Sequence, residues 1–132
     1  MRPLPEPSFL SRPFWDAARE HRLTRPHCPH CDKSFFVPQV ACPRCLSEDW
    51  EWRESSGRGQ VYSYTVCHRA PVPGFETPYA IAIVDLEEGW QMMSNLVEVD
   101  PDEIAFGQQV EVNWLDLTPD TTLPVFAPIH NP

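Results

Sequence analysis

Hydrophobic and polar residues alternate along the second half of the chain with the period of two that is typical of β-strands. Turn residues such as Pro73-Gly74 and Glu87-Glu88-Gly89 separate the alternating segments. These segments are residues 60–68, 79–86, 91–97, 109–117 and 123–129. Before the fourth segment, residues 100–106 indicate a short helix or turn that Gly107 closes. Five strands at this spacing favour a small closed barrel of the OB type over a β-sandwich.

The alternation also predicts which side chains point into the barrel. In the fourth segment, Val110, Val112 and Trp114 are expected to face inward, with Glu111 and Asn113 outside. In the first segment, one face should carry Val61, Ser63, Thr65 and Cys67. The opposite face should carry Tyr62, Tyr64, Val66 and His68.

The first 25 residues contain one candidate helix. Ser11 can cap its N-terminus, and Pro13 fits the first turn because its missing N–H has no helical partner there. One face should carry Phe14, Ala18 and His21, which recur at helical spacing. The helix should end at Thr24-Arg25, because Pro26 disfavours helical geometry in the residue before it.

Four of the five cysteines form two Cys-x-x-Cys units, at residues 28–31 and 42–45. Each unit makes a tight turn that aims two thiolates at one point, and two units complete the tetrahedral S₄ site that structural zinc prefers. Strand-like residues on both sides of Pro38 indicate a hairpin between the two units. We predict one structural Zn²⁺ ion, whose binding stabilises residues 26–53. Its ligands would be Cys28, Cys31, Cys42 and Cys45.

Other readings of these residues are weaker. The Cys-Pro-His-Cys motif also occurs in thiol–disulfide oxidants, but such chemistry needs a helix start within a βαβ unit, and the sequence shows none. His27 and His30 could replace a cysteine ligand, although solvated loop histidines are expected. Cys67 and His68 are adjacent strand residues that point to opposite faces, so a nucleophile–base pair is not expected. His21 and His130 are expected to be packed or solvated, and no acid/base pair, phosphate loop or nucleophile elbow indicates a self-sufficient enzyme.

Composition and charge narrow the function classes. Sixteen prolines in 132 residues argue against long helices, helical bundles and coiled coils. The net charge is −9, and it is unevenly distributed. Every lysine and arginine lies within residues 1–69, whereas the charged residues of 70–132 are all aspartate or glutamate. Such a chain is expected to repel nucleic acids and anionic membranes. With no secretory signal and no apolar run long enough to span a bilayer, we expect a soluble, cytoplasmic protein whose cysteines bind metal rather than form disulfides.

Taken together, the motifs divide the chain into an N-terminal helical arm (residues 1–25), a zinc ribbon (26–53) and an OB-fold (54–132). Several short motifs follow one another in a fixed order along the chain. They are Phe14-Trp15, the two cysteine units, Trp52, the run Gly-Arg-Gly-Gln-Val-Tyr-Ser at 57–63, Pro78-Tyr79, and Leu123-Pro-Val-Phe126. This order resembles the acyl-CoA-associated OB-fold family with an N-terminal rubredoxin-like zinc ribbon, over nearly the whole chain.

The resemblance implies a non-catalytic accessory subunit of a thiolase-superfamily enzyme, either an aldolase or an acyltransferase acting on acyl-CoA thioesters, including steroid side-chain CoA esters. The partner, expected as a homodimer in a heterotetramer or larger complex, would carry the catalytic residues. This chain would support its folding and its acyl-CoA site. Some relatives instead accompany hot-dog-fold enoyl-CoA hydratases, which is one alternative; a nucleic-acid-binding zinc-ribbon/OB module is the other.

Two sets of residues are candidates for contacts in such a complex. Phe14 and Trp15 could bind the partner, since aromatic residues are enriched in interface cores, or they could pack on this chain's own ribbon or barrel. CoA phosphates, if they approach this chain, should meet its arginine-bearing half. The candidates there are Arg44, Arg53, Arg58 and Arg69.

Overall fold

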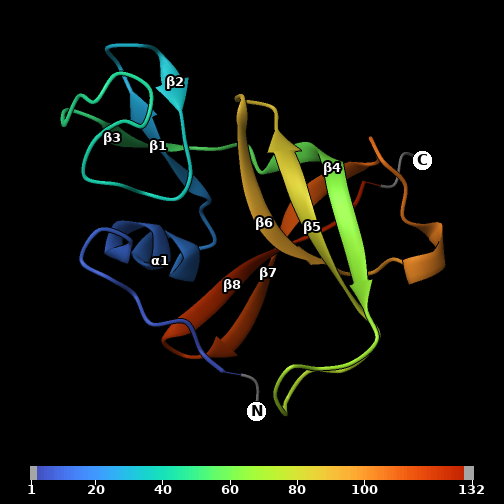
Figure 1. Cartoon of the computed structure of the whole chain (residues 1–132). Helices are drawn as coiled ribbons and strands as arrows, with labels where there is room; N and C mark the ends of the chain where they lie inside the picture. The colour runs from blue at the N-terminus through green and yellow to red at the C-terminus, as the bar shows by residue number, and fades with distance from the viewer. Residues whose placement is uncertain (1–2, 130–132) are drawn as a thin grey trace.

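Within residues 3–129, the computed structural model contains one α-helix, a three-stranded sheet and a five-stranded closed barrel (Figure 1). His130 lies outside the described residues. The N-terminal elements are α1 (Arg12–Arg19), β1 (Thr24–Cys28), β2 (Lys33–Ser34) and β3 (Glu51–Glu54). The barrel elements are β4 (Arg58–Cys67), β5 (Tyr79–Leu86), β6 (Trp90–Leu96), η1, a 3₁₀ turn (Pro101–Glu103), β7 (Gln109–Thr118) and β8 (Thr121–Pro128). The expected fold class, mainly β with an N-terminal helix, a four-cysteine ribbon and a five-stranded barrel, is confirmed.

The helix α1 is shorter than expected. It ends at Arg19, and His21 lies beyond it in a left-handed conformation with φ of 59°. Phe14 is buried with Ala17 and Ala18, whereas His21 is exposed, so the prediction that His21 shares the buried helix face is wrong. Ser11 occupies the N-cap position, but its side chain bonds Ser8 rather than the helix.

The ribbon sheet, with strand order β2-β1-β3, begins at Thr24. Pro26 therefore lies inside a strand, where it does not break the pairing of its neighbours with β3. The β1–β2 hairpin turns between Cys28 and Lys33, and residues 35–41 form no strand, so the expected hairpin around Pro38 is wrong. The two rings of Phe35 and Phe36 explain this course, because they turn into separate clusters against Trp50 and Trp90.

The barrel has the strand order β4-β5-β6-β8-β7, in which β7 also pairs with the start of β4. The expected strands and the turn at Gly89 are confirmed, and Val110, Val112 and Trp114 pack on the core as expected. In β4 the expected alternation holds only as far as Val61. A register shift against β5 between Val61 and Ser63 then reverses the faces, so that Tyr64 and Val66 pack on the core.

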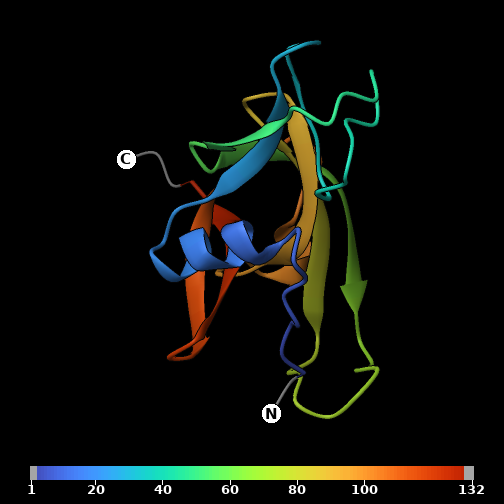
Figure 2. The ribbon, with the colours of Figure 1, turned by 90° about the vertical axis from the view of Figure 1, so that its left-hand side faces the viewer.

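One hydrophobic core joins the barrel to the N-terminal elements. Phe14 and Leu23 belong to the same cluster as Val61, Trp90 and Phe126. The helix α1 packs against β8 and β1, beside the barrel and next to the ribbon (Figure 2). No helix among the described residues is both long and apolar enough to cross a membrane.

The linker from β3 to β4 packs closely against β7 and the β5–β6 turn. Gly57 has φ of +78°, and a Cβ on it would lie 2.3 Å from Cγ1 of Val112, so a side chain there would both strain the backbone and clash with β7. Glu88, in the β5–β6 turn, accepts hydrogen bonds from Ser55 Oγ and from the Ser56 backbone N–H, both at 2.6 Å. The barrel therefore fixes the point at which the ribbon is attached.

Candidate metal centre

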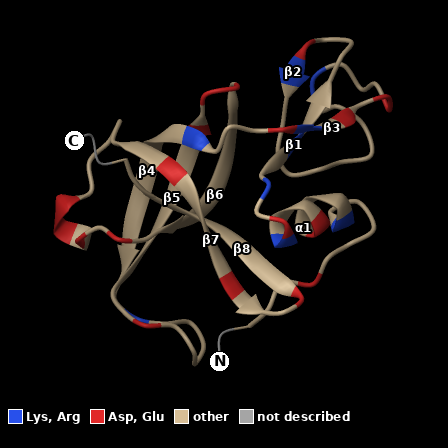
Figure 3. Ribbon diagram, turned by 180° about the vertical axis from the view of Figure 1, so that it is seen from behind, with Lys and Arg blue, Asp and Glu red and all other residues tan. Residues whose placement is uncertain are grey.

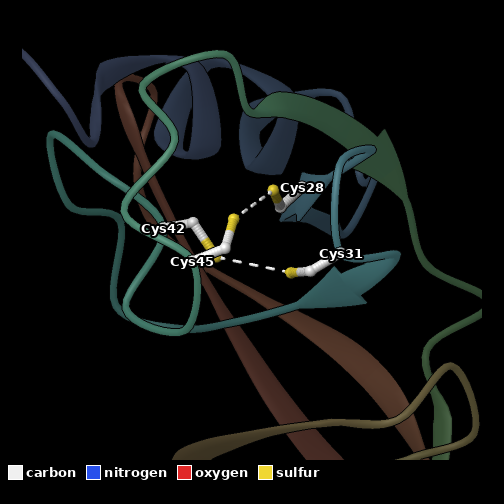
Figure 4. Close-up of side chains that lie close together, drawn as sticks. All are labelled: Cys28, Cys31, Cys42 and Cys45. Atoms are coloured by element: carbon white, nitrogen blue, oxygen red, sulfur yellow. Dashed lines mark hydrogen bonds between the residues drawn. The ribbon is translucent and has the colours of Figure 1, made fainter.

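The four cysteines of the two Cys-x-x-Cys units come from two separate turns that face each other (Figure 4). Cys28 ends β1, and Cys31 lies in the β1–β2 turn. Cys42 and Cys45 belong to the second unit, where the backbone N–H of Leu46 donates to the Cys42 carbonyl and closes the turn. Cys28 and Cys42 are fully buried, Cys31 is half-buried and Cys45 is exposed.

The sulfur positions match what a tetrahedral metal ion requires. All four Sγ atoms lie within 4.8 Å of one another, and the Cys28–Cys45 and Cys31–Cys42 Sγ pairs are 3.5 and 3.7 Å apart. Tetrahedral Zn–S bonds of about 2.3 Å place neighbouring sulfurs roughly 3.8 Å apart. The sulfur atoms are therefore already grouped at zinc-binding separations, and the expectation of one metal ion held by four cysteines is confirmed.

The local electrostatics also suit a dication. Backbone N–H groups of Cys45 and Arg44 point at the Cys42 sulfur and lower the pKa of that thiol to about 6. Burial, together with the neighbouring thiols, raises the pKa of Cys31 to about 12. Four thiols so close together cannot all ionise without a compensating positive charge, so deprotonation of the set and metal binding are coupled.

Histidines lie beside the centre rather than in it. His27 is buried, and its ring nitrogens contact Ser34 Oγ at 2.9 Å and Asp32 Oδ1 at 3.1 Å. His30 is exposed, 3.6 Å from Asp49. Among the described residues, the group that could hold a metal consists of the four cysteines, without either histidine. The Asp32–His27–Ser34 chain was not foreseen from the sequence, because it depends on the β1–β2 register that pairs His27 with Ser34.

Two family models match consecutive parts of the chain. The rubredoxin-like zinc ribbon domain of ChsH2 matches residues 15–51, and the C-terminal OB-fold domain of ChsH2 matches residues 52–115. A DUF35 domain-containing scaffold protein from Pyrococcus furiosus is 37% identical over 110 residues, which are 81% of this chain and 79% of that protein. The chain belongs to the ChsH2 (DUF35) family.

Individual members of the ChsH2 family match most of the length of this chain. A chain of the structure named Ltp2-ChsH2(DUF35) aldolase superposes with a TM-score of 0.86 at 42% identity, covering 94% of this chain and 98% of that one. The probable enoyl-CoA hydratase alpha subunit of Thermomonospora curvata is 46% identical over 116 residues. These residues make up 87% of this chain but only 36% of that protein, so this chain spans about a third of its length. Benzoylsuccinyl-CoA thiolase subunit BbsA of Geobacter metallireducens is 33% identical over 64% of this chain and 56% of that protein.

The aromatic pair of α1 lies at the junction of the two domains of this ChsH2-family chain. Phe14 is only 4% exposed, and its ring centroid lies 5.3 Å from that of Phe36 and 6.5 Å from that of Trp52. Trp15 is half-buried and meets Phe14 edge to face. The alternative left open by the sequence, packing on the chain's own ribbon and barrel, therefore describes Phe14, while the outer edge of Trp15 remains accessible.

The four candidate arginines do not form one cluster. Arg53 pairs with Glu51 at 2.6 Å and Arg58 with Glu87 at 3.3 Å, in both cases at exposed positions. Arg58 begins β4 and Arg69 follows its end, roughly 30 Å away for a strand of ten residues. In the described part of the chain, no carboxylate lies within ion-pair distance of Arg44 or Arg69. Most of the bases lie over α1 and the ribbon, as Figure 3 shows.

A cleft between ribbon and barrel is another feature that the sequence does not reveal. It encloses about 760 Å³, with Phe36 and Arg44 from the ribbon on one side and Asp85 and Trp90 from the barrel on the other. These residues are more than forty positions apart in sequence. The docking of the ribbon on the β5–β6 hairpin brings them together, so no local sequence motif predicts the cleft.

Proposed function

We propose that this chain is a non-catalytic accessory subunit that binds a thiolase-superfamily enzyme acting on acyl-CoA thioesters. The observation that carries the proposal is the similarity to a chain of the Ltp2-ChsH2(DUF35) aldolase, because it extends over nearly all of both chains. The similarity to BbsA, a named subunit of a thiolase, points to the same class of partner.

The side chains of this protein support the accessory role. Four of its thiols are grouped for a structural metal ion, and closed four-cysteine sites leave no open position for a substrate. The fifth, Cys67, is half-buried at the end of β4, and no hydrogen bond joins it to a titratable side chain among the described residues. The partner would therefore supply the catalytic groups.

The proposal extends to how the complex is built. Two accessory chains would bind one partner homodimer, giving a heterotetramer in the cytoplasm, and each would support the folding and the acyl-CoA site of its neighbour. Retro-aldol cleavage of a steroid side-chain CoA ester is the reaction we favour, since the solved relative is an aldolase and a relative from Mycobacterium tuberculosis is named a 3-oxo-4,17-pregnadiene-20-carboxyl-CoA hydratase alpha subunit.

A second candidate partner is an enoyl-CoA hydratase. The relative with 46% identity is named as a hydratase alpha subunit, and this chain matches about a third of it. In that case this chain would associate with a hydratase instead of a thiolase-superfamily enzyme. The two candidates differ in their partner and in the reaction that the complex catalyses, so one experiment separates them.

The test is reconstitution from purified proteins. The chain is mixed with Ltp2 and with each thiolase-superfamily enzyme and enoyl-CoA hydratase of its own genome, and the mass of any complex is measured by light scattering. We expect a 2:2 complex with a thiolase-superfamily enzyme and acyl-CoA turnover that needs both components. Binding to a hydratase alone would favour the second candidate. Tight binding of single-stranded nucleic acid at low salt, without either enzyme, would contradict both.

A further inference from the structure

A groove of about 600 Å³ opens at the end of the barrel that lies away from the ribbon. It forms where β5 begins and β6 ends, whereas the opposite ends of these two strands line the cleft against the ribbon (Figure 1). The two hollows therefore lie at opposite ends of the β5–β6 hairpin. The described ribbon residues contribute nothing to the walls of the distal groove, which we call the mouth groove.

The walls of the mouth groove are largely apolar. The rings of Phe75 and Tyr79 stack with their centroids 5.4 Å apart on one side, and Leu115, 37% exposed, lies on another. The remaining apolar walls include Leu96, Val97 and Val125. A concave surface of this composition that stays open to solvent is typical of a binding site.

Two carboxylates, Glu76 and Glu98, also line the groove, and both are exposed. Among the described residues, no lysine or arginine lines it, and the sequence has none after Arg69. The ion pairs made by arginines in the described residues lie on α1, the ribbon and the start of β4. Within residues 3–129, the donor to the Glu98 carboxylate is the Asn113 amide, at 3.5 Å. The groove thus presents negative charge that the described residues do not neutralise.

We propose that the mouth groove docks a segment of the thiolase-superfamily partner that presents apolar side chains together with a lysine or arginine. This inference rests on the proposed function and adds the surface at which the partner binds. A second copy of this chain fits poorly, because it too carries a net charge of −9. The phosphates of a CoA ester would likewise be repelled by Glu76 and Glu98. A cationic, apolar segment satisfies both the walls and the carboxylates.

The test measures the affinity of the full-length, zinc-loaded chain for purified Ltp2 and for each purified thiolase-superfamily enzyme of its own genome. The double variant Glu76→Gln/Glu98→Gln keeps the size of both side chains and removes their charge. We expect it to weaken binding about tenfold and to flatten the salt dependence of the dissociation constant. Glu111→Gln is the matched control, since Glu111 is an exposed carboxylate on β7 outside the groove, and its affinity should equal that of the wild type.

A second variant, Leu115→Ser, tests the apolar wall without changing charge. It should weaken binding and leave the salt dependence unaltered, while zinc content and the urea midpoint report that each variant is folded. If the wild type binds and the double variant binds equally well, the mouth groove is not the docking site, although the proposed function stands. If no thiolase-superfamily enzyme binds the wild type, both ideas are wrong. If the free chain forms a dimer that the double variant dissociates, the occupant of the groove is a second copy of this chain. If the free chain binds acyl-CoA and the double variant binds it more tightly, the occupant is acyl-CoA. Either result would overturn the proposed occupant.

Discussion

At the scale of single residues, burial distinguishes the cysteines of the metal centre. Cys28 and Cys42 have no exposed surface, while Cys45 is exposed at the rim. A buried thiolate that loses its metal has neither solvent nor cation to stabilise it, so the two buried positions should tolerate substitution least. Cys67 offers a comparison within the same chain, because it is half-buried and is not one of the four grouped cysteines.

Replacing Cys42 with serine should remove the metal. A hydroxyl is a poor zinc ligand compared with a thiolate, so zinc measured by mass spectrometry after purification should fall from one ion per chain to a small fraction. Cys67→Ser should retain a full equivalent of zinc. Full zinc in Cys42→Ser, or loss of zinc in Cys67→Ser, would mean that the centre is not the four-cysteine group.

Among the elements, α1 packs against both the ribbon and the barrel. Phe14 belongs to the barrel core and also contacts Phe36 and Trp52 of the ribbon. Beyond its last turn, His21 stacks on Trp114 with a centroid distance of 5.5 Å and contacts Asp116 at 3.1 Å. The helix is therefore a structural connector whose inner face is already occupied.

Truncating Phe14 should lower stability more than truncating another phenylalanine of the same segment. Phe14→Ala leaves a cavity in a shared core and should cost about 3–4 kcal/mol of unfolding free energy, measured by urea denaturation of the zinc-loaded protein. Phe9 is 85% exposed, and Phe9→Ala should change stability by less than about 0.5 kcal/mol. Equal effects would show that α1 does not anchor the two units.

The linker between β3 and β4 provides a second connection, through Glu88. Burial of its carboxylate raises the pKa, but hydrogen bonds from Ser55 and Ser56 outweigh this and hold the pKa of Glu88 below its ordinary value. Because the folded-state pKa is lowered, the bonds stabilise the fold above the unfolded-state pKa of about 4.3, and this contribution disappears as the pH falls through the folded-state value.

Glu88→Gln should accordingly cost about 1 kcal/mol at pH 7, and the difference from the wild type should vanish at acidic pH below the folded-state pKa. Urea denaturation of both proteins across the pH range measures this difference. Glu111→Gln, at an exposed carboxylate on β7, should show no such pH-dependent difference. A difference that grows towards low pH would contradict the assignment of the hydrogen bonds.

Local patterns predicted most of these elements, and the deviations have local causes. The barrel strands and the cysteine set depend on alternation and spacing, which are properties of the sequence itself. The two faces of β4 could not be predicted in this way, because the register shift after Val61 depends on pairing with β5. The Phe14 environment, the ribbon–barrel cleft and the mouth groove depend on contacts between segments far apart in sequence, for which no spacing rule exists.

At the scale of the whole molecule, two clusters of very different size share the chain. The ribbon's own cluster contains Cys28, Phe35 and Cys42, with Cys31 and Trp50 packed against it. Three of these five side chains belong to the four-cysteine group that could hold a metal ion. The barrel cluster is built from thirteen buried residues and contains none of the metal-binding cysteines. Stability of the ribbon should therefore depend on the metal far more than stability of the barrel does.

Removing zinc with a strong chelator at pH 7 should consequently unfold the ribbon and leave the barrel folded. Hydrogen exchange followed by mass spectrometry should show loss of amide protection in β1–β3 and retained protection in β4–β8, because the barrel hydrogen bonds and core do not involve the cysteines. The helix α1 should lose part of its protection, since Phe14 would keep its barrel contacts and lose those to Phe36 and Trp52. Re-adding zinc should restore the ribbon. If protection were lost in parallel across β4–β8, the shared core around Phe14 would couple the two units into one cooperative fold, and the metal would stabilise the whole chain.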